Sequence, residues 1–137
     1  MGYSFNPFTG TFDNVGSATP AVTVVPLIAA TSIIAYKVIT TNASGQAIYA
    51  DSATLAHANT VIGIAGNAAS AGGSVGVQNS GIITNSGWSW TAGETLFLGS
   101  NGDLTRNALT GLFTLRVGYA KSPTEVYIRI ERGIIRV

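Results

Sequence analysis

Residues 48–130 carry a series of short runs rich in β-branched and aromatic residues, among them Val61-Ile62-Gly63-Ile64-Ala65, Ser74-Val75-Gly76-Val77-Gln78, Thr95-Leu96-Phe97-Leu98-Gly99 and Val126-Tyr127-Ile128-Arg129-Ile130. Clusters of Gly, Asn and Ser separate these runs, and a turn signal recurs about every ten residues, a spacing typical of an all-β sandwich or barrel. We therefore predict an all-β fold with one compact domain over residues 21–137. Residues 1–20 are predicted to form an extended N-terminal docking arm and linker.

Two short segments are predicted to reverse the chain. Asn101-Gly102 predicts a tight hairpin turn, because Asn and Gly tolerate the positive φ angles that both central positions of a type I′ turn require. Asn79-Ser80-Gly81 is interpreted as a second hairpin turn, since it stands between two β-rich runs. Residues 51–59 are the only segment predicted to form helical turns, with Asp51 or Ser52 as the cap.

Alternation of apolar and polar residues assigns faces in two other places. In residues 126–131, Val126, Ile128 and Ile130 are expected to face the core, and the residues between them to face outward. The same alternation in Trp88-Ser89-Trp90 puts both indoles on one face. Three interpretations of this pair stay open: a core contact, a subunit-interface anchor, or a platform on which a carbohydrate stacks.

The composition predicts that other protein covers much of the surface. Of the 137 residues, 46% are hydrophobic and 9% are charged, whereas an ordinary globular domain carries roughly 25% charged residues. Because a monomer of this size needs charge to stay well hydrated, we expect a homo-oligomer or a larger assembly. A surface of Ser, Thr, Asn and Gly is an alternative explanation, and the two are compatible.

Several classes of partner are not expected. The net charge is +1, and the spaced residues Arg129, Arg132 and Arg136 alternate with Glu131 and apolar residues, so no basic cluster predicts nucleic-acid binding. The most apolar window, residues 21–36, contains Pro26 and several threonines, and no membrane span is predicted. The absence of cysteine excludes disulfides, thiolate chemistry and Cys-type zinc sites.

The polar chemistry predicts no enzyme. His57 is the only histidine. Gly72-Gly73-Ser74-Val75-Gly76 fits the five-residue Gly-x-Ser-x-Gly pattern, but a strand follows it instead of the helix that a nucleophile elbow requires, so the pattern does not predict a catalytic triad with His57 and Asp51. We expect His57 to be a hydrogen-bonded packing residue. No spacing predicts a metal site or a cofactor, and residues 67–73 lack the lysine of a phosphate-binding loop. Calcium bound by backbone and Asp oxygens stays open, since such sites need no fixed motif.

The N-terminal arm is the strongest candidate for partner binding. Its aromatic residues cannot build a core of their own, so they must dock onto the same domain or onto another chain, and we favour another chain. The predicted partner-binding residues of the whole chain are Tyr3, Phe5, Asn6, Pro7, Phe8, Phe12, Trp88 and Trp90.

Two stretches resemble small virion proteins of tailed bacteriophages. Residues 3–13, Tyr-Ser-Phe-Asn-Pro-Phe-Thr-Gly-Thr-Phe-Asp, are similar to the Asn-Pro-Phe-Thr-Gly opening of many of them. From Ile48 onward, the runs at 50–58, 61–64, 74–84, 88–90 and 117–125 resemble a β-domain common in capsid decoration proteins and in head or tail fibre parts.

This resemblance implies a non-enzymatic virion structural protein. We expect it to bind the assembled phage capsid as a decoration, or cement, protein that clamps neighbouring subunits. Its expected partners are the major capsid protein or another virion protein, and itself as a homo-oligomer, for which the resemblance implies a trimer. The alternative is a tail, fibre or baseplate component, including a receptor- or glycan-binding tip. The expected location is therefore the capsid surface, or alternatively the tail.

Overall fold

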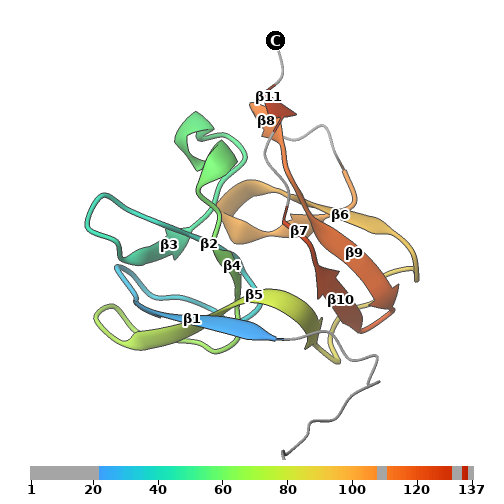
Figure 1. The fold of residues 1–137 in the computed structure, drawn as a ribbon, viewed down its shortest axis with the longest axis horizontal. Coiled ribbons are helices and arrows are strands. Elements are labelled where there is room, and N and C mark those ends of the chain that lie inside the picture. Colours follow the sequence, from blue (N-terminus) through green and yellow to red (C-terminus); the bar gives the residue numbers. More distant parts are fainter. Residues whose placement is uncertain (1–21, 108–110, 131–133, 136–137) are drawn as a thin grey trace, which may run out of the picture.

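The computed structural model of the chain describes residues 22–107, 111–130 and 134–135 (Figure 1). Within them the predicted all-β fold is confirmed, since the only helical pieces there are the 3-10 turns η1 (Leu55–Asn59) and η2 (Ser100–Gly102). The strands are β1 (Thr23–Ile28), β2 (Val38–Thr41), β3 (Ala47–Tyr49), β4 (Gly63–Ala65), β5 (Ser74–Thr84), β6 (Thr95–Leu98), β7 (Leu104–Thr105), β8 (Phe113–Thr114), β9 (Arg116–Ser122), β10 (Glu125–Ile128) and β11 (Ile134–Ile135). The predicted arm, residues 1–20, lies outside the described residues.

One antiparallel sheet forms the body, in the order β3-β2-β4-β5-β10-β9-β6-β7, and it curls into a half-barrel (Figure 1). Strand β5 joins its two halves: the first part of β5 pairs with β1 and β4, and the second part pairs with β10. The prediction of a hairpin at Asn79-Ser80-Gly81 is wrong, because β5 continues through these residues without a turn. Gly81 has a φ of 84°, which lets the strand change direction without reversing.

The turn after β6 closes the curl against the segment that follows β3. Asn101 and Gly102 have φ angles of 50° and 77°, and they join β6 to β7, so the predicted turn is confirmed. The backbone N–H of Gly102 donates to the carbonyl of Ala50 at 2.6 Å, and that of Ser52 donates to the carbonyl of Gly99 at 3.1 Å. The two halves of the sheet are therefore joined at β5 and again at this turn.

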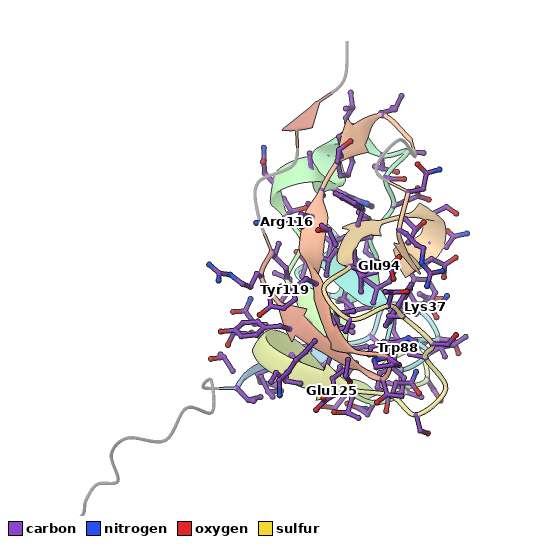
Figure 2. All side chains as sticks on the ribbon, turned by 90° about the vertical axis from the view of Figure 1, so that its right-hand side faces the viewer. Lys37, Trp88, Glu94, Arg116, Tyr119 and Glu125 are labelled. Atoms are coloured by element: carbon purple, nitrogen blue, oxygen red, sulfur yellow. The ribbon has the colours of Figure 1, made fainter. Side chains whose placement is uncertain are left out.

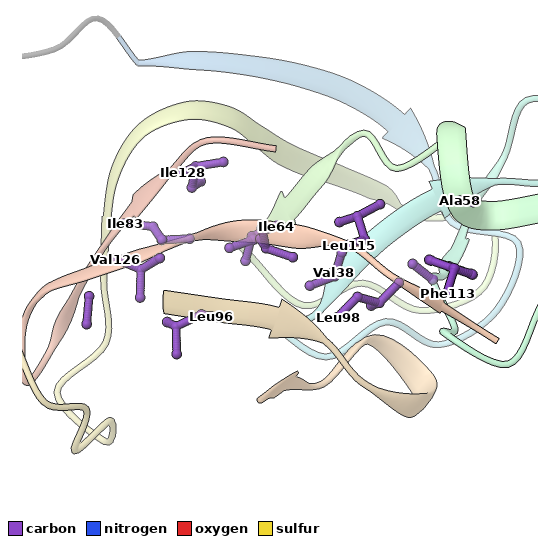
Figure 3. Close-up of a cluster of buried hydrophobic side chains, with 13 residues drawn as sticks. Val38, Ala58, Ile64, Ile83, Leu96, Leu98, Phe113, Leu115, Val126 and Ile128 are labelled. Carbon is purple, nitrogen blue, oxygen red and sulfur yellow. The ribbon is translucent and has the colours of Figure 1, made fainter. Parts of the chain in front are cut away.

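The larger of two hydrophobic clusters fills the inside of the curl (Figure 3). Leu96 and Val117 from one half meet Val38 and Ile64 from the other. Phe113, on β8 outside this sheet, packs in the same cluster, and all five side chains are fully buried. Burial of each such side chain contributes about 1.5–3 kcal/mol. A smaller cluster lies on the opposite face of β2 and β4 and includes Ile39, Ala65, Val75 and Val77.

The pleat explains how short strands serve both clusters. Adjacent residues of a strand point to opposite faces, so Val38 belongs to the larger cluster and its neighbour Ile39 to the smaller one. The predicted alternation in β10 is confirmed in the same way, because Val126 and Ile128 are buried while Arg129 is exposed.

Two local predictions need correction. The run Trp88-Ser89-Trp90 is not a strand: the N–H of Trp88 donates to the carbonyl of Asn85 in a turn, and that of Trp90 donates to the carbonyl of Pro123. The predicted helical turns in residues 51–59 are confirmed only as η1, and neither Asp51 nor Ser52 caps them. Thr54 holds the cap position without a side-chain hydrogen bond.

We predict that Gly102→Ala destabilises the fold well beyond Gly45→Ala. Both glycines have a φ near 78°, so alanine costs about 1–2 kcal/mol in backbone strain at either position. A Cβ on Gly45 meets nothing within 4 Å, whereas one on Gly102 would lie 2.9 Å from the carbonyl oxygen of Val38. Overpacking adds about 1–3 kcal/mol. Urea unfolding of the two variants measures the difference, and equal losses would contradict the closing role of the turn.

Candidate functional site

The predicted site residues have two different outcomes. Tyr3, Phe5, Asn6, Pro7, Phe8 and Phe12 lie outside the described residues, so their role as docking residues stays a prediction. Trp88 and Trp90 are both half-buried and pack against the larger hydrophobic cluster. They also line a cleft of about 570 Å³ between the loop that precedes β2, the loop between β5 and β6, and the turn between β6 and β7. We call it the aromatic cleft.

Three aromatic rings form one wall of the aromatic cleft. The centroids of Tyr36 and Trp88 lie 5.4 Å apart with the rings inclined at 66°, an edge-to-face contact. The centroids of Trp88 and Trp90 lie 6.2 Å apart with an angle of 49°. Both distances fall in the range of favourable aromatic pairs. Sequence reasoning missed Tyr36, because nothing local in the sequence connects it with the tryptophans.

The backbone of Tyr36 has an unusual conformation. Its φ angle is 70°, in the left-handed region that costs a residue with a side chain about 1–2 kcal/mol. A hydrogen bond stabilises this conformation, since the N–H of Tyr36 donates to the carbonyl of Ala65 at 2.7 Å. In this conformation the ring lies against Trp88. Such strain, at a residue lining a cleft, is an independent sign of a functional role.

Polar side chains from other segments line the rest of the cleft. Lys37 Nζ and the carboxylate of Asp103 form an ion pair in this lining, which joins the residue before β2 to the turn after β6. Their side chains are 28% and 54% exposed, so the pair is accessible to a ligand. Asn85, Ser100 and Thr105 complete the polar lining.

A second ion pair, between Arg106 and Glu94, lies beside Trp90. The guanidinium of Arg106 lies 5.1 Å from the ring centroid of Trp90, and its Nε donates to the carboxylate of Glu94. Together with a hydrogen bond from the N–H of Thr91, this contact holds the pKa of Glu94 below its usual value. Figure 2 shows Lys37, Trp88 and Glu94 on the same side of the molecule.

The indole N–H of Trp90 is buried and, among the residues that the structure describes, has no hydrogen-bond partner. An unpaired buried donor costs about 1–3 kcal/mol. Packing against the core and the stacked guanidinium of Arg106 therefore hold this ring, rather than a hydrogen bond of its own.

The predicted role of His57 agrees with its contacts. Its Nδ1 accepts a hydrogen bond from the backbone N–H of Asp51 at 3.0 Å, so the two residues meet through the backbone of Asp51. The carboxylate of Asp51 instead accepts from the N–H of Ala53 at 2.9 Å. Among the described residues, no three His, Cys, Asp or Glu side chains gather as metal ligands would.

The outward face of β1 is a second candidate surface, which we call the β1 stripe. It consists of Val24, Pro26 and Ile28, which alternate along the strand and so share a face, together with the preceding Val22. Val22, Val24 and Ile28 are 54%, 54% and 49% exposed. Within the described ranges β1 pairs with β5 alone, so its other edge has no strand partner there. Large apolar side chains on such an edge are typical of a contact surface.

A third surface, on β9 and β10, combines aromatic and charged side chains. On β9 and β10, the rings of Tyr119 and Tyr127 stack with centroids 5.4 Å apart, and the guanidinium of Arg129 lies 6.0 Å from the centroid of Tyr127. Arg116 lines a small pocket with Tyr119 and Arg129. In Figure 2, Arg116 and Tyr119 lie on the side away from Lys37 and Trp88, so this face is separate from the aromatic cleft.

No protein-family model matches the chain, and no curated protein is significantly similar to it. None of the helices in the described segments is long and apolar enough to cross a membrane.

We predict a pH-dependent contribution of Glu94 to stability. Its pKa is lower in the folded state than the usual value of about 4.3, so the unfolded chain binds a proton first. The contribution is complete above that usual value and disappears as the pH falls through the lowered pKa. The melting temperature of Glu94→Gln should therefore lie below that of the wild type at neutral pH, and the gap should shrink in acid. A gap that stays constant from pH 7 to pH 3 would contradict this.

Proposed function

We propose that this chain is a non-enzymatic structural protein of a phage virion, bound to the assembled capsid as a decoration protein that clamps neighbouring subunits. The observation that carries the proposal is the β1 stripe, an exposed apolar face on a strand that directly follows the arm. The resemblance of residues 3–13 to the opening of phage virion proteins supports the same assignment.

The distribution of charge supports burial of the surface around β1 and β5 in an assembly. Residues 52–93, which include β4 and β5, contain no Asp, Glu, Lys or Arg, and neither does β1. Stable contact surfaces between proteins are depleted in charged residues at their centre. A partner can therefore cover the β1 stripe and the adjoining part of β5 without removing an ion from water.

The energy for such binding comes from apolar burial. At roughly 25 cal/mol per Å² of apolar area, an arm with four aromatic side chains contributes several kcal/mol before the cost of ordering it. The β1 stripe adds apolar area, and in the sequence it directly follows the end of the arm. Because arm and stripe are continuous in the chain, one partner surface can engage both. The same surface suits contact with a second copy of the chain, and the phage resemblance favours a trimer.

A location on the tail or on a fibre is the second candidate. The aromatic cleft favours it, because a pocket with aromatic walls and a few polar groups is typical of ligand sites and would suit a receptor contact on a tail. An antibody against the chain, used to label phage particles that encode it, separates the two in electron micrographs. Label over the head supports the capsid assignment, and label confined to the tail supports the alternative.

We predict that deletion of residues 1–14 leaves a folded oligomer that no longer loads onto particles. The deleted segment precedes every described strand, so the β-domain keeps its pairing. Loading is measured by adding the purified protein to particles that lack it and sedimenting them. Normal loading of the shortened chain would refute the role of the arm.

We predict that the double variant Val24→Lys, Ile28→Lys folds but loses self-association or loading. Both side chains are about half exposed, so lysine is tolerated in the isolated subunit but leaves a charge unpaired in a buried contact. Leu55→Lys is the matched control, because Leu55 is 48% exposed and belongs to η1 and not to β1 or its partner β5. Sedimentation of the variants measures the effect, and equal behaviour of all three proteins would count against the β1 stripe.

A further inference from the structure

We infer that the aromatic cleft binds an uncharged saccharide. The inference concerns the isolated chain and holds for a capsid or a tail position alike. It starts from the cleft volume of about 570 Å³, which lies within the range of roughly 300–1,000 Å³ that small-molecule sites occupy. A site of this size accepts one or two sugar rings together with their hydration.

The aromatic wall matches the apolar face of a sugar. A pyranose ring presents carbon-bound hydrogens on its faces and hydroxyl groups around its rim, and an aromatic ring covers the former without competing for the latter. Trp88 is the central ring, in contact with Tyr36 on one side and Trp90 on the other. The other two rings are inclined to it by 66° and 49°, so the three rings present faces in different directions to a ligand.

The polar lining matches the hydroxyl rim. The ammonium of Lys37 and the carboxylate of Asp103 provide donors and an acceptor beside the aromatic wall, and both are accessible. Asn85 and Thr105 add an amide and a hydroxyl group from two further segments. Hydrogen bonds from sugar hydroxyls to charged groups are roughly twice as strong as those between neutral groups. Donors and acceptors therefore converge from several directions on the space next to Trp88.

The ion pairs at the cleft favour a neutral ligand over an anionic one. Lys37 is paired with Asp103, and Arg106, which supports Trp90, is paired with Glu94. A nucleic-acid strand or an acidic sugar needs cations that are not already neutralised. Because each cation here has its own carboxylate, the cleft offers polarity without net charge, which selects a neutral ligand.

The cleft is also prepared before a ligand arrives. Tyr36 is held in its strained conformation against Trp88, and Arg106 is fixed over Trp90 by its ion pair with Glu94. Rings that are already ordered lose little conformational entropy on binding. The strained backbone and the unpaired indole N–H of Trp90 both reduce stability, a combination expected where a site is maintained for binding.

The test uses the purified full-length chain on an array of neutral and acidic glycans, followed by titration of the best neutral glycan while tryptophan fluorescence is recorded. We expect a neutral glycan to bind and to change the emission of the two indoles. Trp88→Ala should weaken its affinity at least 10-fold. Tyr119→Ala removes an exposed ring outside the cleft and should change the affinity less than 2-fold.

Asp103→Asn is a second variant, for the case that Trp88→Ala misfolds. The Asp103 side chain is 54% exposed and asparagine has nearly the same shape, so this variant should keep the fold. It frees the charge of Lys37, so it should weaken binding of the neutral glycan at least 3-fold and shift the array toward acidic glycans. The inference is overturned if no glycan on the array binds, if acidic glycans bind the wild type best, or if Tyr119→Ala weakens binding as much as Trp88→Ala. None of these results depends on virions, so the capsid proposal and this one fail separately.

Discussion

The structure depends on one contact between backbone segments: the turn at Asn101 and Gly102 lies against the chain that follows β3. A sheet in which β3 and β7 are the outermost strands would otherwise stay open. The hydrogen bonds from Gly102 to Ala50 and from Ser52 to Gly99 draw its ends together. Gly102 has no space for a Cβ there, because the carbonyl oxygen of Val38 would be 2.9 Å away. Close approach of two backbones requires glycine at this position.

The same contact builds the aromatic cleft. Lys37 immediately precedes β2, and Asp103 immediately follows the turn, so they meet only when the turn is docked. Tyr36, next to Lys37, is brought to Trp88 by the same closure. The larger hydrophobic cluster lies behind these residues, and Tyr36, Trp88 and Trp90 pack against it. Core burial and the geometry of the cleft are therefore linked, and a change that opens the curl affects both.

Features of the fold that neighbouring residues decide could be predicted from the sequence, whereas those that depend on contacts between distant residues could not. The turn at Asn101 and Gly102 was predictable because two residues with positive φ decide it locally. The faces of β10 were predictable because alternation is a property of the strand itself. The prediction of a hairpin at residues 79–81 was wrong, since β1 pairs with Ser80 and β10 pairs with Gly81, and pairing over long distances outweighs a local turn signal.

The candidate site shows the same limit. Trp88 and Trp90 were identified from their spacing, and they do lie side by side, but a turn and a bond to Pro123 hold them rather than a strand ladder. Tyr36, Lys37 and Asp103 carried no signal, because residues far apart in sequence become neighbours only through closure of the sheet. The β1 stripe was also hidden, since a run of Val, Pro and Ile reads as core until its exposure is known.

The separation of charge explains how one small domain can serve two contacts. Of the charged residues in the described segments, Arg116, Lys121, Glu125 and Arg129 lie on or directly beside β9 and β10, whereas β1 and residues 52–93, with β4 and β5, contain none. The surface around the β1 stripe can therefore be dehydrated at little cost, while the charged residues elsewhere keep the molecule hydrated. The cleft, lined from both halves, has its cations neutralised by neighbouring carboxylates. An assembly that covers the β1 stripe leaves the charged residues of β9 and β10 in contact with water.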